Sequence, residues 1–222
     1  MESKVLQIAR RARQAAWEIA SLSTEVKNAA LHRARESLVL HQEKIFKANR
    51  EDKEKAQALV ASGEMSKALF KRLDIEGSKF DSVLAGLDDV IRLPDPVGKV
   101  DYAMRLDDGL DLYRVSCPMG VLGVIFEARP DAGVQIASLA IKSSNAVILK
   151  GGREAERTNE ALATALREGI SSVKGVPADA LQLISTRGEV QEMLRLDGLI
   201  DLLIPRGSNE LVRSIQGATR IP

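Results

Sequence analysis

The stretch VLGVIFEARPDAGVQIASLAIKSSNAVILK, residues 121–150, decides the fold of this chain. It starts with a short apolar run, continues with a helical pattern, and ends with a second short apolar run. Continuous apolar runs of this length are typical of strands that are buried on both faces of a parallel sheet. Residues 121–150 therefore predict a strand, a covering helix and a second strand parallel to the first.

The same alternation continues toward the end of the sequence. The expected strands are 121–127, 145–149, 181–185 and 199–204. The expected helices are 131–143, 154–171, 187–196 and 208–217. Alternation of this kind predicts an α/β fold with a parallel sheet that is covered by helices.

The first hundred residues have a different pattern. Apolar residues recur at helical spacing from Val5 to Ile19, from Ala30 to Ile45, and over 64–84, where we expect an interruption near Gly77. Ser23 or Thr24 can cap the second of these helices. The breaker cluster at 93–98, Leu-Pro-Asp-Pro-Val-Gly, marks the clearest boundary in the chain.

An Asp-Gly pair follows this boundary. Asp107-Asp108-Gly109 lies between two runs of alternating apolar residues, which predicts a β-hairpin over 102–115. We therefore expect an N-terminal helical segment at 1–100, a hairpin at 101–117 and an α/β domain at 118–222.

Composition excludes several classes of protein. The 222 residues carry 32 Lys+Arg against 31 Asp+Glu, and this balance favours neither nucleic-acid binding nor a polybasic membrane surface. One cysteine cannot form an internal disulfide, and no apolar run reaches the roughly 20 residues of a membrane helix. The first residues lack the apolar core of a signal peptide. We expect a soluble cytoplasmic protein with no nucleic-acid or membrane partner.

The residues that follow the expected strands are the candidates for ligand binding, because ligands of open parallel sheets bind beyond the carboxyl ends of the strands. Four arginines, one lysine and several small residues fall there, which suits an anionic ligand. The alternative is that these are ordinary strand–helix loops. The candidates are Glu127, Arg129, Lys150, Gly151, Gly152, Arg153, Arg187, Arg206, Gly207 and Ser208.

Several chemical motifs are absent from the sequence. It contains neither G-x-G-x-x-G nor G-x-x-x-x-G-K-[ST], and one Cys with two His cannot build a zinc site, so we expect no metal. Cys117 precedes the first strand of the sheet, at the end opposite to the expected ligand edge. We interpret it as a small packing residue and not as a nucleophile.

Three segments carry a resemblance to a known family. They are PMGVLGVIFEARPD (118–131), IASLAIKSSNAVILKGGREAERTN (136–159) and DLLIPRGSNELV (201–212), supported by RLD at 72–74 and DPVGKV at 95–100. Together they closely resemble the glutamate-5-semialdehyde dehydrogenases, also called γ-glutamyl phosphate reductases, of the aldehyde dehydrogenase superfamily. The resemblance implies an aldehyde-dehydrogenase-like, Rossmann-type sheet with helices on both faces, preceded by N-terminal helices and a hairpin.

The resemblance also implies a reaction, the NADPH-dependent reduction of L-glutamyl 5-phosphate to glutamate 5-semialdehyde with release of phosphate, in proline biosynthesis. A cysteine thiolate attacks the acyl phosphate, and hydride from the nicotinamide reduces the resulting thioester. It further implies a homo-oligomer, held in part by a flap that the hairpin resembles, and coupling to glutamate 5-kinase.

Site residues carry over by position. Lys150 matches the superfamily lysine near the adenosine ribose, and Arg153 stands where many NAD-using relatives have a carboxylate, which favours NADP because an arginine can pair with a 2′-phosphate. Gly151 and Gly152 lie between them. Gly207 and Ser208 match the helix start that meets the pyrophosphate.

Substrate residues and the nucleophile remain to be placed. Glu127, Arg129 and Arg206 are the candidates to line the junction of nicotinamide and substrate, although Glu127 and Arg129 equally fit a salt-bridged loop. The family's catalytic cysteine lies in a separate catalytic domain, and Cys117 does not match it. We therefore expect a chain that is truncated before the catalytic domain and is inactive alone.

Two alternatives remain open. The chain could be a non-catalytic nucleotide- or phosphate-binding module, or a structural subunit of a split enzyme.

Overall fold

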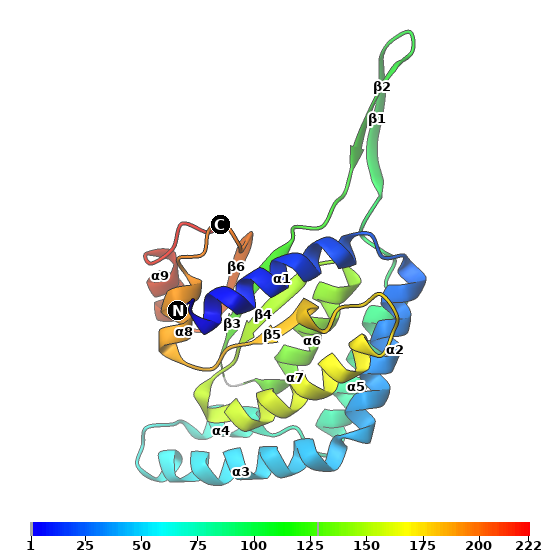
Figure 1. The fold of residues 1–222 in the computed structure, drawn as a ribbon. Coiled ribbons are helices and arrows are strands. Elements are labelled where there is room, and N and C mark those ends of the chain that lie inside the picture. Colours follow the sequence, from blue (N-terminus) through cyan, green and yellow to red (C-terminus); the bar gives the residue numbers. More distant parts are fainter. Residues whose placement is uncertain (1, 128) are drawn as a thin grey trace.

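The computed structural model describes residues 2–127 and 129–222, and a four-stranded parallel sheet lies at its centre. The strand order is β5-β4-β3-β6 (Figure 1). β3 is buried at every position, as its continuous apolar run requires. The predicted parallel sheet is confirmed. Its strands are β3 (Val121–Phe126), β4 (Ala146–Lys150), β5 (Leu181–Leu183) and β6 (Leu202–Arg206).

Helices cover both faces of this sheet. The chain moves outward from β3 to β4 to β5 and then returns to place β6 on the other side of β3. Because connections between parallel strands are right-handed, the helix before β6 lies on the opposite face of the sheet from the helices before β4 and β5. The helix between β3 and β4, α6 (Pro130–Lys142), and the next one, α7 (Glu156–Ser171), share one face. The first helix, α1 (Lys4–Ala20), and α8 (Arg187–Met193) contact one another on the other face.

Short elements complete the α/β part. Two single 3₁₀ turns, η1 (Arg153–Ala155) and η2 (Ala178–Ala180), precede α7 and β5. The helix α9 (Asn209–Gln216) follows β6 and starts at the carboxyl edge of the sheet. Its Ser208 cap accepts a hydrogen bond from the Leu211 amide at 3.3 Å.

The N-terminal helices share the hydrophobic core of the sheet. One continuous buried cluster runs from the apolar face of α1 through α2 and α5 to the strands. α2 packs along α7, and α5 packs on α6. These helices are α2 (Thr24–Leu40), α3 (Gln42–Ala61), α4 (Lys67–Leu73) and α5 (Ser78–Arg92).

Two of the predicted helical regions are divided. The apolar stripe from Ala30 to Ile45 predicted one helix, but the chain turns at His41, which ends α2 and precedes α3. The interruption of 64–84 that was expected near Gly77 is confirmed, because the region is divided between α4 and α5 and Gly77 adopts a positive φ of 59°. The apolar period continues through the turn at His41 because Leu38 and Ile45, on either side of it, are buried in one core. Leu73 of α4 instead packs in a small separate cluster with Ala56 and Ala155.

The fourth strand also differs from its prediction. Residues 199–204 were expected, and β6 spans Leu202–Arg206. The amides of Leu199 and Ile200 bond to the Leu196 carbonyl, so these two apolar residues form a turn and not a strand, with Ile200 buried and Leu199 partly buried. Pro205 and Arg206 consequently lie inside the strand instead of after it.

An exposed hairpin projects from the body as an arm (Figure 1). It consists of β1 (Val100–Asp107) and β2 (Leu110–Val115), and every residue of both strands is exposed. Gly109 has φ 78°, so the predicted Asp-Gly turn is confirmed. The arm exposes Val100, Tyr102, Met104, Leu106, Leu110, Leu112, Tyr113 and Val115.

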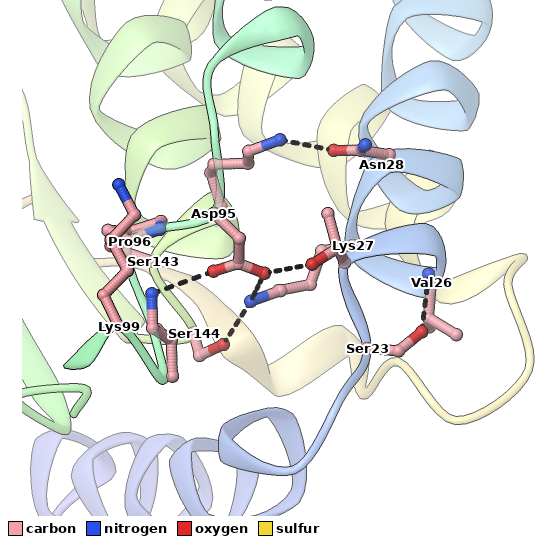
Figure 2. A network of polar contacts seen from close by, with 12 residues as sticks. Ser23, Val26, Lys27, Asn28, Asp95, Pro96, Lys99, Ser143 and Ser144 are labelled. Carbon is pink, nitrogen blue, oxygen red and sulfur yellow. Dashed lines mark hydrogen bonds and ion pairs between the residues drawn. The ribbon is translucent and has the colours of Figure 1, made fainter. Parts of the chain in front are cut away.

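A buried polar network anchors the segment that leads into this arm (Figure 2). The Lys27 ammonium of α2 lies 2.5 Å from the Asp95 carboxylate and donates to the Ser144 hydroxyl at 3.0 Å. Asp95 also accepts from the Thr24 hydroxyl at 2.6 Å and from the Val97 amide at 3.0 Å. Asp95 lies in the predicted boundary cluster, and its carboxylate thus connects that cluster to α2 and to the turn before β4.

None of the helices in the described ranges is long and apolar enough to cross a lipid bilayer.

Candidate functional site

The carboxyl edge of the sheet is built around the neighbours β3 and β6. The chain order reverses between these two strands, and this is the place where open parallel sheets bind their ligands. Phe126, the last residue of β3, pairs in register with Arg206, the last residue of β6. The two following loops, which contain Glu127 and Gly207, therefore start side by side.

Glu127 contacts the start of α9. The Ser208 amide donates a hydrogen bond to Oε2 of Glu127 at 3.1 Å. A Cβ atom on Gly207 would lie 2.5 Å from the same oxygen, so only glycine lets this carboxylate approach the helix start. The structure thus brings together Glu127, Gly207 and Ser208, which are about 80 residues apart in sequence. An anionic ligand at this helix start would have to displace the Glu127 carboxylate.

Lys150 lies at the end of β4 and is partly buried. Burial lowers the pKa of its ammonium below the ordinary value, and the positive charges of Arg153 and Arg187 act in the same direction against the negative charges of Glu154 and Glu127. Its charged neighbours therefore come from three strand ends, those of β3, β4 and β5. A lysine in this setting favours an additional anion.

The two glycines after Lys150 are tightly packed. A Cβ on Gly151 would lie 2.8 Å from Cγ of Asn159 and 3.2 Å from the ring of Phe126, and one on Gly152 would lie 2.7 Å from Oε2 of Glu154. The space at Gly151 is closed by the buried side chains of Asn159 and Phe126, whereas the Glu154 carboxylate beside Gly152 can rotate away. Such loops let a ligand approach the main chain closely.

Arg153 starts the turn η1 and is exposed. It forms no ion pair with any residue of the two described ranges. Its guanidinium is therefore available to an external anion at the rim of this loop.

Arg129 is already paired within its own segment of the chain. Its guanidinium pairs with Asp131 at 2.7 Å, and this hydrogen bond raises the pKa of Arg129. It lines a groove between the start of α6 and the segment that joins α4 to α5. A salt-bridged loop was one of the two roles predicted for Arg129 and Glu127. The structure shows this arrangement for Arg129, whereas Glu127 accepts a hydrogen bond from a backbone amide. Arg206 is exposed at the end of β6.

At the end of β5, the backbone amides of the loop are already bound by a side chain of the protein. Thr186 caps α8, and the Glu189 carboxylate accepts hydrogen bonds from the amides of Ser185 and Thr186 at 2.9 and 2.8 Å. Lys4 of α1 donates to the other oxygen at 2.9 Å. An external anion would therefore find fewer free hydrogen-bond donors in this loop than in the loops after β4 and β6.

Glu189 gives the fold a specific acid sensitivity. Burial alone would raise the pKa of this carboxyl, but Lys4 and the two amides outweigh it and lower the pKa from 4.5 to about 2. Because the folded pKa is depressed, its stabilising effect is complete above about pH 4.5 and is lost as the pH falls toward 2. We expect Glu189→Gln to lower the free energy of unfolding by about 1–2 kcal/mol at pH 7. Urea titrations at several pH values should show this difference shrinking below pH 4.5; a difference that is independent of pH would contradict it.

Asn159 was not among the site residues predicted from the sequence. It lies on α7, is buried, and its Oδ1 has no hydrogen-bond partner among the described residues. Its side-chain amide packs against Gly151. Its position in the helix was the one indication in the sequence that it has a special role. Thr158 and Asn159 are polar residues on the inward face of an amphipathic helix.

Comparisons with known proteins agree with this architecture. No protein-family model matches the chain. A gamma-glutamyl phosphate reductase of Methanosarcina mazei is 48% identical over 222 residues, which cover 100% of this chain and 49% of that protein. The chain is a relative of the gamma-glutamyl phosphate reductases.

Solved structures of gamma-glutamyl phosphate reductases share this fold. The Saccharomyces cerevisiae protein superposes with a TM-score of 0.92 at 42% identity, covering 100% of this chain and 55% of its own. The Thermotoga maritima protein gives 0.93 at 32% identity, with 99% and 52% covered. A Bacillus subtilis aldehyde dehydrogenase, 19% identical with a TM-score of 0.73, has the same fold. The chain spans about half the length of the gamma-glutamyl phosphate reductases that it matches.

Proposed function

We propose that this chain forms the cofactor-binding part of an NADPH-dependent reductase that converts L-glutamyl 5-phosphate to L-glutamate 5-semialdehyde and phosphate in proline biosynthesis. The observation that carries the proposal is the strand end Lys150-Gly151-Gly152-Arg153, next to the carboxyl edge where Glu127 meets Gly207 and Ser208. The similarity to gamma-glutamyl phosphate reductases supports the reaction class.

The residues at this edge fit a phosphorylated dinucleotide. Gly151 and Gly207 leave space where a side chain would collide, and Arg153 is an exposed cation without a protein partner in the described ranges. A guanidinium binds phosphate through paired, charge-assisted hydrogen bonds. We therefore assign Arg153 to the 2′-phosphate of NADP, Lys150 to the ribose, and Gly207 with Ser208 to the pyrophosphate. The bound cofactor would supply the hydride.

The other candidate residues of this chain would bind the substrate and orient it against the cofactor. Glu127 accepts a hydrogen bond from the amide of Ser208 and would have to yield that donor to the pyrophosphate. We assign its displaced carboxylate to the junction of nicotinamide and substrate. Arg129 and Arg206 supply cations for substrate oxygens. Cys117 is exposed, so its interpretation as a small packing residue is wrong. It precedes the amino end of β3, and we therefore propose that the nucleophilic thiolate is not among these 222 residues.

The exposed arm supports the remaining proposals. Eight large apolar side chains on a two-stranded ribbon form a surface that a partner would cover, and we assign it to homo-oligomer contacts. Coupling to glutamate 5-kinase and a cytoplasmic location follow from the proposed pathway.

Titration of the purified chain with NADPH and NADH tests the cofactor assignment. We expect NADPH to bind more tightly, and Arg153→Glu to weaken NADPH binding by about 10- to 100-fold, because the reversed charge repels the 2′-phosphate. NADH binding should change by less than about threefold. Fluorescence of the bound nicotinamide measures both.

Cys117→Ser is the matched control in this titration, because Cys117 lies at the opposite end of the sheet from Lys150. It should bind both nucleotides as the unaltered chain does. Equal binding of NADPH and NADH by the unaltered chain would contradict the assignment of Arg153, and the absence of binding to either would contradict the proposed function.

A further inference from the structure

A second recess lies away from the strand ends that we assign to the nucleotide. It is an open groove of about 520 Å³ between the start of α6 and the α4–α5 segment. Four cations and two carboxylates line it, giving a formal charge of +2. The charged residues are Lys71, Arg72, Asp74, Lys79, Arg129 and Asp131.

The cations of this groove differ in how far they are already engaged. Arg129 is paired with Asp131 at 2.7 Å, and Asp74 lies between Lys53 at 2.7 Å and Lys79 at 3.5 Å. Lys71 and Arg72 are exposed, and neither forms an ion pair within the described part of the chain. The groove therefore keeps free positive charge next to carboxylates that are partly exposed.

The wall that carries Arg72 is built on the core. Asn49 is fully buried, and its side chain donates to the Leu73 carbonyl at 2.8 Å and accepts from the Ile75 amide at 3.3 Å. These two bonds hold the backbone on both sides of Asp74. Opposite this wall, the Gln135 side chain packs on Gly86, where a Cβ would lie 3.0 Å from its Cδ. The charged groups are thus presented from fixed elements.

The groove and the edge of the sheet share one loop. Arg129 lines the groove, and Glu127 of the same loop contacts the start of α9. Two residues of chain span at most about 7 Å. A small ligand can consequently reach from the groove toward the strand ends.

We propose that this groove binds the zwitterionic α-amino-acid end of the substrate, with Arg72 and Lys71 binding its carboxylate and Asp131 its ammonium. This rests on the proposed function, which supplies a glutamyl substrate. Free cations and partly exposed carboxylates in one recess match a group that carries both charges, whereas a simple anion site would need only the cations. The acyl phosphate end then extends toward Glu127 and Arg206.

Binding of L-glutamate by the chain, followed by NMR, tests the assignment. Glutarate lacks the ammonium and 4-aminobutyrate lacks the α-carboxylate, so we expect each to bind about tenfold more weakly than L-glutamate. Arg72→Gln should weaken L-glutamate about fivefold or more, and Asp131→Asn should weaken L-glutamate without weakening glutarate. Arg92→Gln, an exposed arginine outside the groove, should bind L-glutamate as the unaltered chain does.

Several outcomes would overturn this inference. They are equal binding of glutarate and L-glutamate, an unchanged affinity in Arg72→Gln, or resonance shifts that avoid the groove. Parallel titration with NADPH separates the two proposals. NADPH binding without L-glutamate binding overturns the groove and leaves the cofactor assignment intact, whereas L-glutamate binding without NADPH binding supports the groove and contradicts the proposed function.

Discussion

Lys27→Met is expected to lower the free energy of unfolding by about 3 kcal/mol or more. The side chain is fully buried, and its ammonium neutralises Asp95 and satisfies the Ser144 hydroxyl. Methionine fills the space but leaves the carboxylate without its counter-ion. Removing one partner of a buried ion pair typically costs about 3–5 kcal/mol, because an uncompensated charge stays in the interior. Urea unfolding, followed by circular dichroism, measures the loss.

Two further variants separate this charge effect from lost packing. Adding Asp95→Asn to Lys27→Met should recover part of the stability, because the unpaired charge is then removed. Arg33→Met, which breaks the exposed pair with Glu36, should change the stability by about 0.5 kcal/mol or less. A double variant that is no more stable than Lys27→Met alone would show that the charge is not the cause.

Gly169→Ala is expected to destabilise the chain by about 1–3 kcal/mol, although alanine is the better helix former. Gly169 of α7 faces α2, and a Cβ there would lie 2.6 Å from the Arg33 carbonyl oxygen and 2.7 Å from the Ala34 nitrogen. These are backbone atoms, which cannot rotate away, so the two helices would have to separate. Thermal unfolding measures the effect.

Gly188→Ala provides the matched control for this substitution. Gly188 also lies in a helix, but a Cβ there meets only the Thr186 hydroxyl, at 3.9 Å. This variant should be as stable as the unaltered chain or slightly more stable. If Gly169→Ala were equally stable, the close packing of α2 on α7 would not be under steric restraint.

The order of the elements could be predicted from the sequence because each strand and helix has its own apolar period. The turn at 199–200 was missed for a related reason. Ile200 is fully buried, and burial shapes the apolar pattern whether the backbone is extended or turned. What distinguishes the two is the hydrogen bond to Leu196, which leaves no trace in composition.

The candidate site was predictable only in part. The rule for strand ends located Glu127, Lys150 and Ser208 without any knowledge of which strands are neighbours. It could not show that Glu127 reaches the Ser208 amide, because that contact depends on β6 lying beside β3. Nor could it separate Arg129 from the others, since the pairing with Asp131 is a matter of side-chain direction.

The arm of β1 and β2 has a consequence for how the protein folds. A ribbon of two strands is marginally stable in water when nothing packs on it. Both outer edges of this ribbon offer unpaired backbone donors and acceptors, which can add a strand from another chain. With a second copy covering the arm, as we propose, the last step in ordering it is a bimolecular event. Its rate and yield should then depend on protein concentration and not on the sequence of the arm alone.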